Sequence, residues 1–146
     1  MQILKPKVIT LFFALSAIFL SGCATPLSTA QKQELQGLKA KGYAVEEKNP
    51  GAAAALGILP GFGSFYVREY GAGVVNLLLW PASVLWDPVS GYEGARSINY
   101  YATMHKVDRL EERELSSLED QLMIDAIDNR EYVMEKREIN EKYSAY

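Results

Sequence analysis

The chain has 146 residues, of which 49% are apolar and 23% are charged, a balance that excludes an intrinsically disordered protein. Its formal charge of −3, with no cluster of lysine and arginine, argues against nucleic-acid binding. A single cysteine excludes a disulfide framework and a cysteine-rich metal site, and a single histidine excludes a histidine metal cage within one chain. One small domain with extensions is the most that this length accommodates.

The first 22 residues have the composition of a secretory signal peptide. Two lysines lie within the first seven residues, residues 8–20 are mostly apolar, and small residues precede Cys23. As a helix, the apolar run is about 20 Å long, which is short of the ~30 Å hydrocarbon core of a bilayer. We therefore expect residues 1–22 to be removed by cleavage rather than to remain as a membrane span.

Leu20-Ser21-Gly22-Cys23 resembles the lipobox of bacterial lipoproteins. The resemblance implies that diacylglycerol is attached to the Cys23 thiol and that the chain is cleaved between Gly22 and Cys23. It also implies that a fatty acid such as palmitate then acylates the new amine. Two or more acyl chains anchor a protein stably, whereas one chain binds it marginally. Apart from these covalent lipids on Cys23, we expect no cofactor.

Ala24 bears on the destination of such a lipoprotein. In enteric-type sorting, an aspartate after the lipidated cysteine favours retention in the inner membrane, so Ala24 favours transfer to the outer membrane, facing the periplasm. The inner membrane stays open as the alternative, because a strongly inserting apolar segment would tend to stop there. Cleavage also removes Lys5 and Lys7, which moves the formal charge from −3 to −5.

After the cleavage position the sequence falls into three parts of different composition. Residues 23–48 are polar, and we expect a lipid-anchored tether that contains a short helix. Residues 49–103 are apolar and contain only five charged side chains. Residues 104–146 are dense in charge, and a broken stripe of leucines predicts a long charged amphipathic helix there. Glu138 and Lys142 are spaced to form an ion pair on one face of that helix.

Capping signals predict where the helices of the two polar parts begin and end. Ser28 with Gln31 fits a capping box, and Gly42 fits the end of the helix that follows. Ser116 with Glu119 is a second capping-box match. The charged part could therefore contain two helices that meet near Ser116.

Two apolar stretches in the middle part predict a helical hairpin. Asn49-Pro50 is a favourable helix start, and Pro60-Gly61 breaks the first stretch. The second stretch, Gly71 to Trp86, is divided by Pro81, and we expect Asp87-Pro88 to end it. Such a hairpin could pack in a soluble core, lie in a membrane interface, or span by borrowing flanking residues.

The middle part carries a second resemblance, over residues 54–87. The run from Gly61 to Tyr66, with glycine four residues before Phe-Tyr, and the acid that follows an aromatic in Trp86-Asp87 resemble the two-transmembrane-helix (TM2) domain. Ser64 and Arg68 depart from that family, which usually has a basic residue and a glycine there. The resemblance implies a membrane-associated hairpin and no reaction. The whole pattern also resembles small uncharacterised lipoproteins of Gram-negative bacteria.

Candidate catalytic groups are few. A serine–histidine–acid triad would have to use His105, which stands in the charged part and is expected to be an exposed surface residue. Acylation of Cys23 would remove the only thiol nucleophile. The glycines from Gly57 to Gly63 match neither a P-loop nor a dinucleotide fingerprint. We expect these glycines to form turns and to allow close packing of helices, and we expect Ala53 to allow close packing as well.

Acidic residues give no stronger candidate for a metal or catalytic site. Glu111-Glu112 and Glu119-Asp120 are expected to be solvated, because they lie in a charged helix without a calcium-loop pattern. Asp87 lies beside apolar surface, and we expect it to be hydrogen-bonded where a helix ends. We therefore predict no catalytic, cofactor-binding or metal residue, and no enzyme.

The sequence as a whole predicts an all-α lipoprotein of the cell envelope, anchored in the membrane through Cys23. Its expected role is structural or interaction-based, in scaffolding or assembly, with an envelope protein or a second copy as the partner. The alternative is an oligomeric protein inserted in the membrane through its apolar hairpin.

Overall fold

The structure, a computed structural model, describes residues 25–146. Every regular element among these residues is a helix, which confirms the predicted all-α fold. The predicted signal peptide and Cys23 lie outside the described residues. The elements are α2 (Thr29–Ala40), α3 (Pro50–Leu56), α4 (Phe62–Tyr66), α5 (Tyr70–Leu78), the 3-10 helix η1 (Ala82–Leu85), α6 (Asp87–Met123) and α7 (Asn129–Tyr143).

Contacts between residues divide the described chain into two units. Unit 1 consists of residues 25–26 and Lys48–Arg96, and unit 2 consists of Leu27–Glu47 and Ser97–Tyr146. Helix α6 contributes its first turns to unit 1 and the remainder to unit 2. The change of composition at residue 103 therefore falls inside one unbroken helix.

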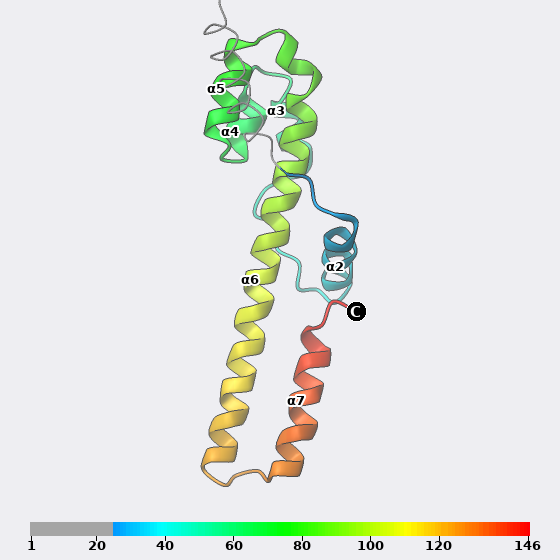
Figure 1. Cartoon of the computed structure of the whole chain (residues 1–146), viewed down its shortest axis with the longest axis vertical. Coiled ribbons are helices and arrows are strands. Elements are labelled where there is room, and N and C mark those ends of the chain that lie inside the picture. Colours follow the sequence, from blue (N-terminus) through cyan, green and yellow to red (C-terminus); the bar gives the residue numbers. More distant parts are fainter. Residues whose placement is uncertain (1–24) are drawn as a thin grey trace, which may run out of the picture. The chain divides into compact units, whose positions relative to one another are not determined.

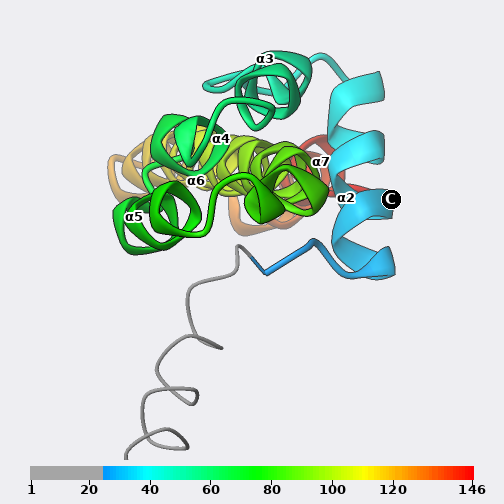
Figure 2. The same cartoon turned by 90° about the horizontal axis from the view of Figure 1, so that it is seen from above.

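In unit 1, the short helices α3, α4 and α5 lie beside the first turns of α6 (Figures 1 and 2). Asn49 starts α3 as predicted, since its side-chain oxygen accepts a hydrogen bond from the Ala52 N–H at 2.8 Å. Residues 50–86 form three short α-helices and one 3-10 turn, so the predicted two-helix apolar hairpin is not confirmed.

Two prolines set the helix boundaries of unit 1. Pro81 divides the second apolar stretch as predicted, because α5 ends at Leu78 and η1 begins at Ala82. The second apolar stretch ends before Asp87-Pro88 as predicted, since η1 ends at Leu85, but these two residues also begin a new helix, α6, which was not predicted. Proline is well tolerated in the first turn of a helix, where its missing N–H loses no intrahelical partner and its fixed φ suits the helix.

In unit 2, helix α2 begins and ends as the capping signals predict. Ser28 and Gln31 form a complete capping box, with backbone-to-side-chain hydrogen bonds of 2.9 and 3.2 Å. Gly42 follows the helix in the left-handed conformation, φ 81°, and the Tyr43 N–H returns to the Leu38 carbonyl at 3.0 Å. The predicted tether therefore contains a well-delimited helix.

The two long helices of unit 2, α6 and α7, meet later in the chain than predicted. Helix α6 continues through Ser116 to Met123, so the expected boundary near Ser116 is wrong. Asp128 caps α7 instead, accepting hydrogen bonds at 2.8 Å from the N–H groups of Arg130 and Glu131. A capping box needs a residue with extended backbone before the helix, and Ser116 lies in a helix interior.

Unit 2 has an apolar core between α2, α6 and α7. Leu38, Val107 and Tyr143 are buried together, one from each helix. Leu118, from the predicted leucine stripe, is only 2% exposed. The segment between α2 and α3 is attached to α6 by a hydrogen bond of 2.9 Å from the Val45 N–H to the Thr103 hydroxyl. Helix α2 is thus packed against the charged helices.

Candidate functional site

The centre of unit 1 is polar. Asp87, at the start of α6, is fully buried. One of its carboxylate oxygens accepts hydrogen bonds from the N–H and the hydroxyl of Ser64, at 3.2 and 2.5 Å, and from the side-chain amide of Asn76 at 2.8 Å. Ser64 lies on α4 and Asn76 on α5, and both are buried. The carboxylate therefore joins α4, α5 and α6. Such hydrogen bonds are expected, because a buried carboxylate without them would be strongly destabilising.

Trp86 extends this polar cluster to the surface. Its indole N–H donates to the side-chain oxygen of Asn76 at 2.8 Å, while the Asn76 amide also donates to the Ser64 hydroxyl at 3.0 Å. The second carboxylate oxygen of Asp87 and the Ser83 hydroxyl are buried without a hydrogen-bond partner among residues 25–146. We call Ser64, Asn76, Trp86 and Asp87 the polar cluster. The hydrogen bonds among its four side chains, of which those to Asp87 all reach one carboxylate oxygen, make it a structural tie between helices.

Around the polar cluster the helices pack backbone against backbone. A Cβ added at Gly57 would lie 2.5 Å from the backbone of Pro88, and one at Gly91 would lie 2.8 Å from the Ala53 carbonyl oxygen. At Gly63 the added atom would lie 2.8 Å from the Gly57 Cα. These distances are shorter than any real Cβ contact, so α3, α4 and α6 approach as closely as they do only because glycine stands there. The expected role of Gly57 and Gly63 in close packing is confirmed, and Gly91 has the same role.

Most large apolar side chains of unit 1 lie outside rather than in this interior. The buried apolar side chains in its described part are Ala53, Val67 and Ala95. By contrast, Leu78 is 77% exposed and Leu85 is 83% exposed. We call the following exposed residues the apolar surface: Ile58, Leu59, Phe62, Tyr70, Val74, Leu77, Leu78, Leu79, Trp80, Leu85, Trp86, Val89 and Tyr92.

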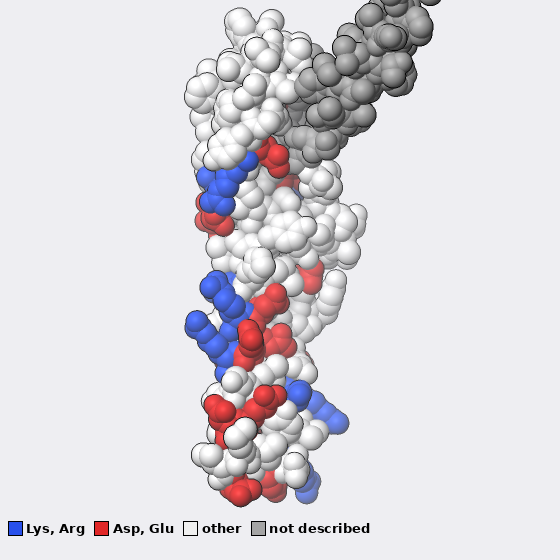
Figure 3. Space-filling model, turned by 60° about the vertical axis from the view of Figure 1, so that its left-hand side comes forward, with Lys and Arg blue, Asp and Glu red and all other residues white. Residues whose placement is uncertain are grey.

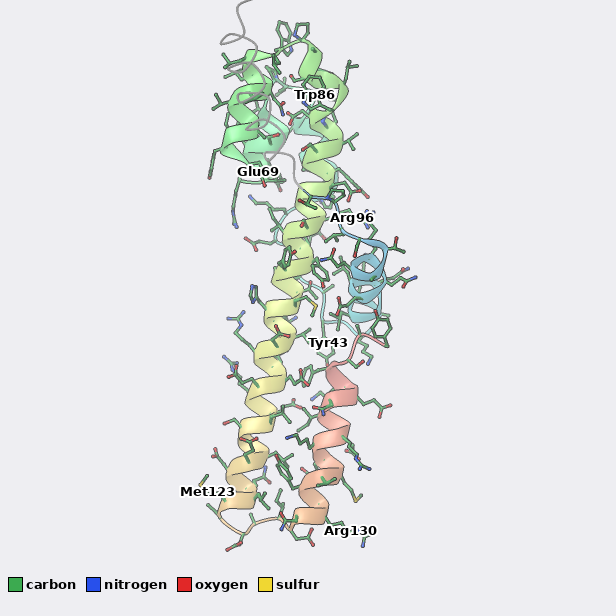
Figure 4. The ribbon with its side chains drawn as sticks, in the orientation of Figure 1. Tyr43, Glu69, Trp86, Arg96, Met123 and Arg130 are labelled. Carbon is green, nitrogen blue, oxygen red and sulfur yellow. The ribbon has the colours of Figure 1, made fainter. Side chains whose placement is uncertain are left out.

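Two partly buried charged residues of unit 1, Glu69 and Arg96, lie toward one of its ends. Lys48 lies over the Tyr66 ring, 4.4 Å from its centroid, and Arg96 pairs with Glu93 at 3.3 Å. Figure 4 shows Glu69 and Arg96 toward one end of the unit and Trp86 toward the other. The end that carries Trp86 is white on the face drawn in Figure 3. Unit 1 therefore has a charged end and an apolar end around a polar interior.

Arg68, in the turn between α4 and α5, adopts an unusual backbone conformation. Its φ is 68°, in the left-handed region that glycine enters without strain. Arginine thus occupies a position whose geometry suits glycine.

The other predicted residues are not brought together in the described part of the chain. His105 is exposed on α6, and of the two acidic pairs Glu111 alone is partly buried. No three histidine, cysteine or acidic residues within residues 25–146 come close enough to hold a metal ion. Gly22 and Cys23, the predicted cleavage and lipid-attachment residues, lie outside the described residues. The described helices also include none that combines the length and apolar content of a membrane span.

Electrostatic contacts in unit 2 join its helices to one another. Lys142 pairs with Glu114 on α6 at 2.5 Å, so the predicted pairing with Glu138 is replaced by one between helices. Hydrogen bonds from Lys142 and Tyr143 lower the pKa of Glu114. The Tyr100 hydroxyl donates to Glu34 on α2 at 2.6 Å. That hydrogen bond, with burial, raises the pKa of Tyr100 to about 12. These contacts hold the helices of unit 2 together.

The polar cluster was the main feature that sequence reasoning missed. Asn76 and Ser64 were noticeable as polar residues in a nearly charge-free apolar segment, and Asp87 as an acid beside tryptophan. Their contact across 23 residues of chain could not be read from spacing. Comparison with protein-family models, with curated proteins and with solved structures finds no match.

Proposed function

We propose that this protein is a lipid-anchored lipoprotein of the cell envelope with a structural or interaction role and no catalysis. The observation that carries the proposal is the pairing of a lipobox-like sequence, Leu20 to Cys23, with a unit whose exposed surface is apolar. Acyl chains on Cys23 would hold the chain at a bilayer, and the apolar surface is suited to that environment. Ala24 favours the outer membrane, on its periplasmic side.

The buried and charged groups support a structural role. One oxygen of the Asp87 carboxylate accepts hydrogen bonds that tie helices together, and His105 is exposed on a charged helix. A partner is expected to be another envelope protein or a second copy of the chain. Exposed apolar side chains around the α6–α7 turn, such as Met123 at 80% and Ile124 at 74%, are suited to such a contact.

The anchor is tested by labelling cells with radioactive palmitate. The full chain should be labelled and fractionate with the membrane, and Cys23→Ser should abolish the label because serine offers no thiol for the thioether. An unlabelled full chain would overturn the anchor.

Two further experiments test attachment and interaction. Replacing residues 1–23 with a cleavable, non-lipid signal peptide shows whether attachment to the membrane depends on lipid. Photo-crosslinking from position 123 in intact cells tests the interaction role, which requires a discrete crosslinked protein.

The second candidate function is an oligomeric protein inserted in the membrane. The exposed apolar surface favours it, because several copies could cover part of that surface against one another. The left-handed Arg68 supports the similarity to the TM2 domain on which the hairpin proposal depends. Crosslinking of the acylated chain in mild detergent distinguishes the two, since a purely monomeric species would exclude the oligomer.

A further inference from the structure

We propose that unit 1 is a monotopic membrane element that seats its apolar surface within one leaflet of the bilayer, without crossing it. The inference deepens the proposed function and rests on it, because the lipid anchor on Cys23 supplies the leaflet. It assigns the apolar surface to phospholipid rather than to a second copy of the chain.

The first argument is the distribution of polarity within unit 1. A helical unit built for water buries its leucines and exposes its polar groups. Unit 1 does the opposite, since Ser64, Asn76 and Asp87 are buried while Leu78 and Leu85 are exposed. Its interior is filled by backbone contacts at glycines rather than by large apolar side chains. Close packing at small residues and polar groups turned inward are what an apolar surrounding favours.

The second argument concerns the shape of the partner. The apolar surface receives side chains from α4, α5, η1 and α6. It also receives side chains from the turns between the helices, such as Ile58 and Leu79. A protein partner covers one patch of a surface, and a two-fold dimer uses the same patch on both copies. A surface supplied by so many elements is better covered by a fluid that adapts to it. Trp80, Trp86 and Tyr92 add aromatic rings of the kind that prefer membrane interfaces.

The third argument is the depth that the helices allow. Helices α3 and α5 have 7 and 9 residues, or about 10 and 14 Å, against ~30 Å for the hydrocarbon core. The charged end, with Glu69 and Arg96, would be costly to bury in hydrocarbon. The apolar end can therefore enter one leaflet while the charged end stays at the headgroups.

The anchor position agrees with this depth. Cys23 precedes Thr25 by two residues, so the two are at most about 7 Å apart along the chain. Residues 25 and 26 belong to unit 1. The acyl chains and the apolar surface can then enter the same leaflet.

Tryptophan fluorescence of the full acylated protein tests the proposal. The chain has two tryptophans, Trp80 and Trp86, which are 58% and 40% exposed and both belong to the apolar surface. The protein is reconstituted in vesicles of phosphatidylethanolamine and phosphatidylglycerol, with phosphatidylcholine brominated in its acyl chains as the quencher. We expect blue-shifted emission that brominated lipid quenches and that acrylamide in the water does not. Trp80→Phe should leave the remaining emission, from Trp86, quenched as well.

A matched pair of variants links the quenching to the apolar surface. Leu78→Asp, at a position 77% exposed in unit 1, should lose most of the quenching by brominated lipid. Met134→Asp, at a position 55% exposed in unit 2, should leave it unchanged. Circular dichroism should give the same helix content for both variants, because neither side chain is in a core. Equal quenching in the two variants would overturn the proposal.

Two other results would also overturn it. Emission at long wavelength that acrylamide quenches would place the apolar surface in water. Blue-shifted emission that brominated lipid does not quench, and that reverts on dilution of protein in lipid, would assign the surface to a second copy. The two proposals fail in different ways. An unlabelled chain in the palmitate experiment overturns the lipid anchor. A labelled chain that brominated lipid does not quench overturns only the proposal that unit 1 enters the leaflet.

Discussion

The two units of this chain solve the same packing problem in opposite ways. Unit 2 buries Leu38, Val107, Leu118 and Tyr143 and surrounds them with charge, as helices in water do. Unit 1 buries a carboxylate, an amide and hydroxyls, and exposes its leucines and tryptophans. Both use helix α6, whose first turns are rich in glycine and alanine and whose later turns are rich in charge. The contrast teaches that helix content alone does not reveal the surroundings for which a helix is built.

The largest effect is expected where the polar interior of unit 1 is broken. Asp87→Ala leaves the N–H and hydroxyl of Ser64 and the amide of Asn76 without their buried acceptor. Loss of bonds to a charged group should lower the free energy of unfolding of unit 1 by about 4 kcal/mol. Urea denaturation in detergent, followed by tryptophan emission, measures it. Asp108→Ala, at an exposed acid on the same helix, should change little.

The corresponding change in unit 2 removes apolar rather than polar material. Leu118→Ala should cost about 3 kcal/mol, because the side chain is 2% exposed and its loss leaves a cavity. Met123→Ala, at a position 80% exposed, should fall within about 0.5 kcal/mol of the parent. Hydrogen exchange of the α6 and α7 amides measures both. Equal losses at positions 118 and 123 would contradict an apolar core in unit 2.

Glycine packing in unit 1 predicts a smaller loss. Gly57→Ala places a methyl group 2.5 Å from the backbone of Pro88, and we expect about 2 kcal/mol of destabilisation. Gly71→Ala is the same substitution in α5, where nothing lies within 4 Å of the added atom. That variant should be neutral or more stable by up to about 1 kcal/mol, since alanine favours helix. Thermal unfolding of the two variants in detergent gives the comparison.

In the turn between α4 and α5, we expect two variants of Arg68 to differ in stability by about 1 kcal/mol. Arg68→Gly should be more stable than Arg68→Ala by roughly that amount, because φ is 68° and alanine is strained there. The two variants lose the same side chain interactions, so their difference isolates the backbone. Denaturant midpoints decide the sign, and a more stable alanine variant would contradict the left-handed conformation.

The smallest effect at neutral pH belongs to the contact between α2 and α6. Tyr100→Phe removes the hydrogen bond to Glu34 and should cost about 1 kcal/mol. The Tyr100 pKa is raised in the folded state from 10.0 to about 12, so its contribution is complete below pH 10 and disappears as the pH rises toward 12. Stability curves over this range should fall for the parent and stay flatter for Tyr100→Phe. Tyr101→Phe, at an exposed neighbour, should follow the parent.

Local signals in the sequence predicted the local structure well. The capping box at Ser28, the asparagine cap at Asn49 and the division at Pro81 depend on residues within four positions of each other, and all are found. The boundary placed near Ser116 failed because a capping-box pattern also occurs inside a helix that tertiary contacts continue. Pro88 was predicted only to end the preceding apolar stretch, whereas it lies in the first turn of α6.

Features that depend on distant residues could not be predicted. The bonds between Ser64, Asn76 and Asp87, and the pairing of Lys142 with Glu114, join positions 11 to 28 residues apart. Composition left open whether the apolar segment packs in a core or faces a membrane, and it did not indicate that glycine, serine, asparagine and aspartate would be among the buried residues of unit 1. Which side chains become buried depends on how several segments pack together, and the sequence of one segment does not contain that information.

The backbone packing in unit 1 has a consequence for how the chain can change over evolution. Because Gly57, Gly63 and Gly91 meet backbone directly, substitution there displaces whole helices. The exposed leucines are not packed in the interior of the unit, so selection at these positions should preserve an apolar side chain rather than one particular side-chain shape. Homologous chains should therefore keep the glycines and the four residues of the polar cluster while their outer side chains drift freely among leucine, isoleucine, valine and phenylalanine.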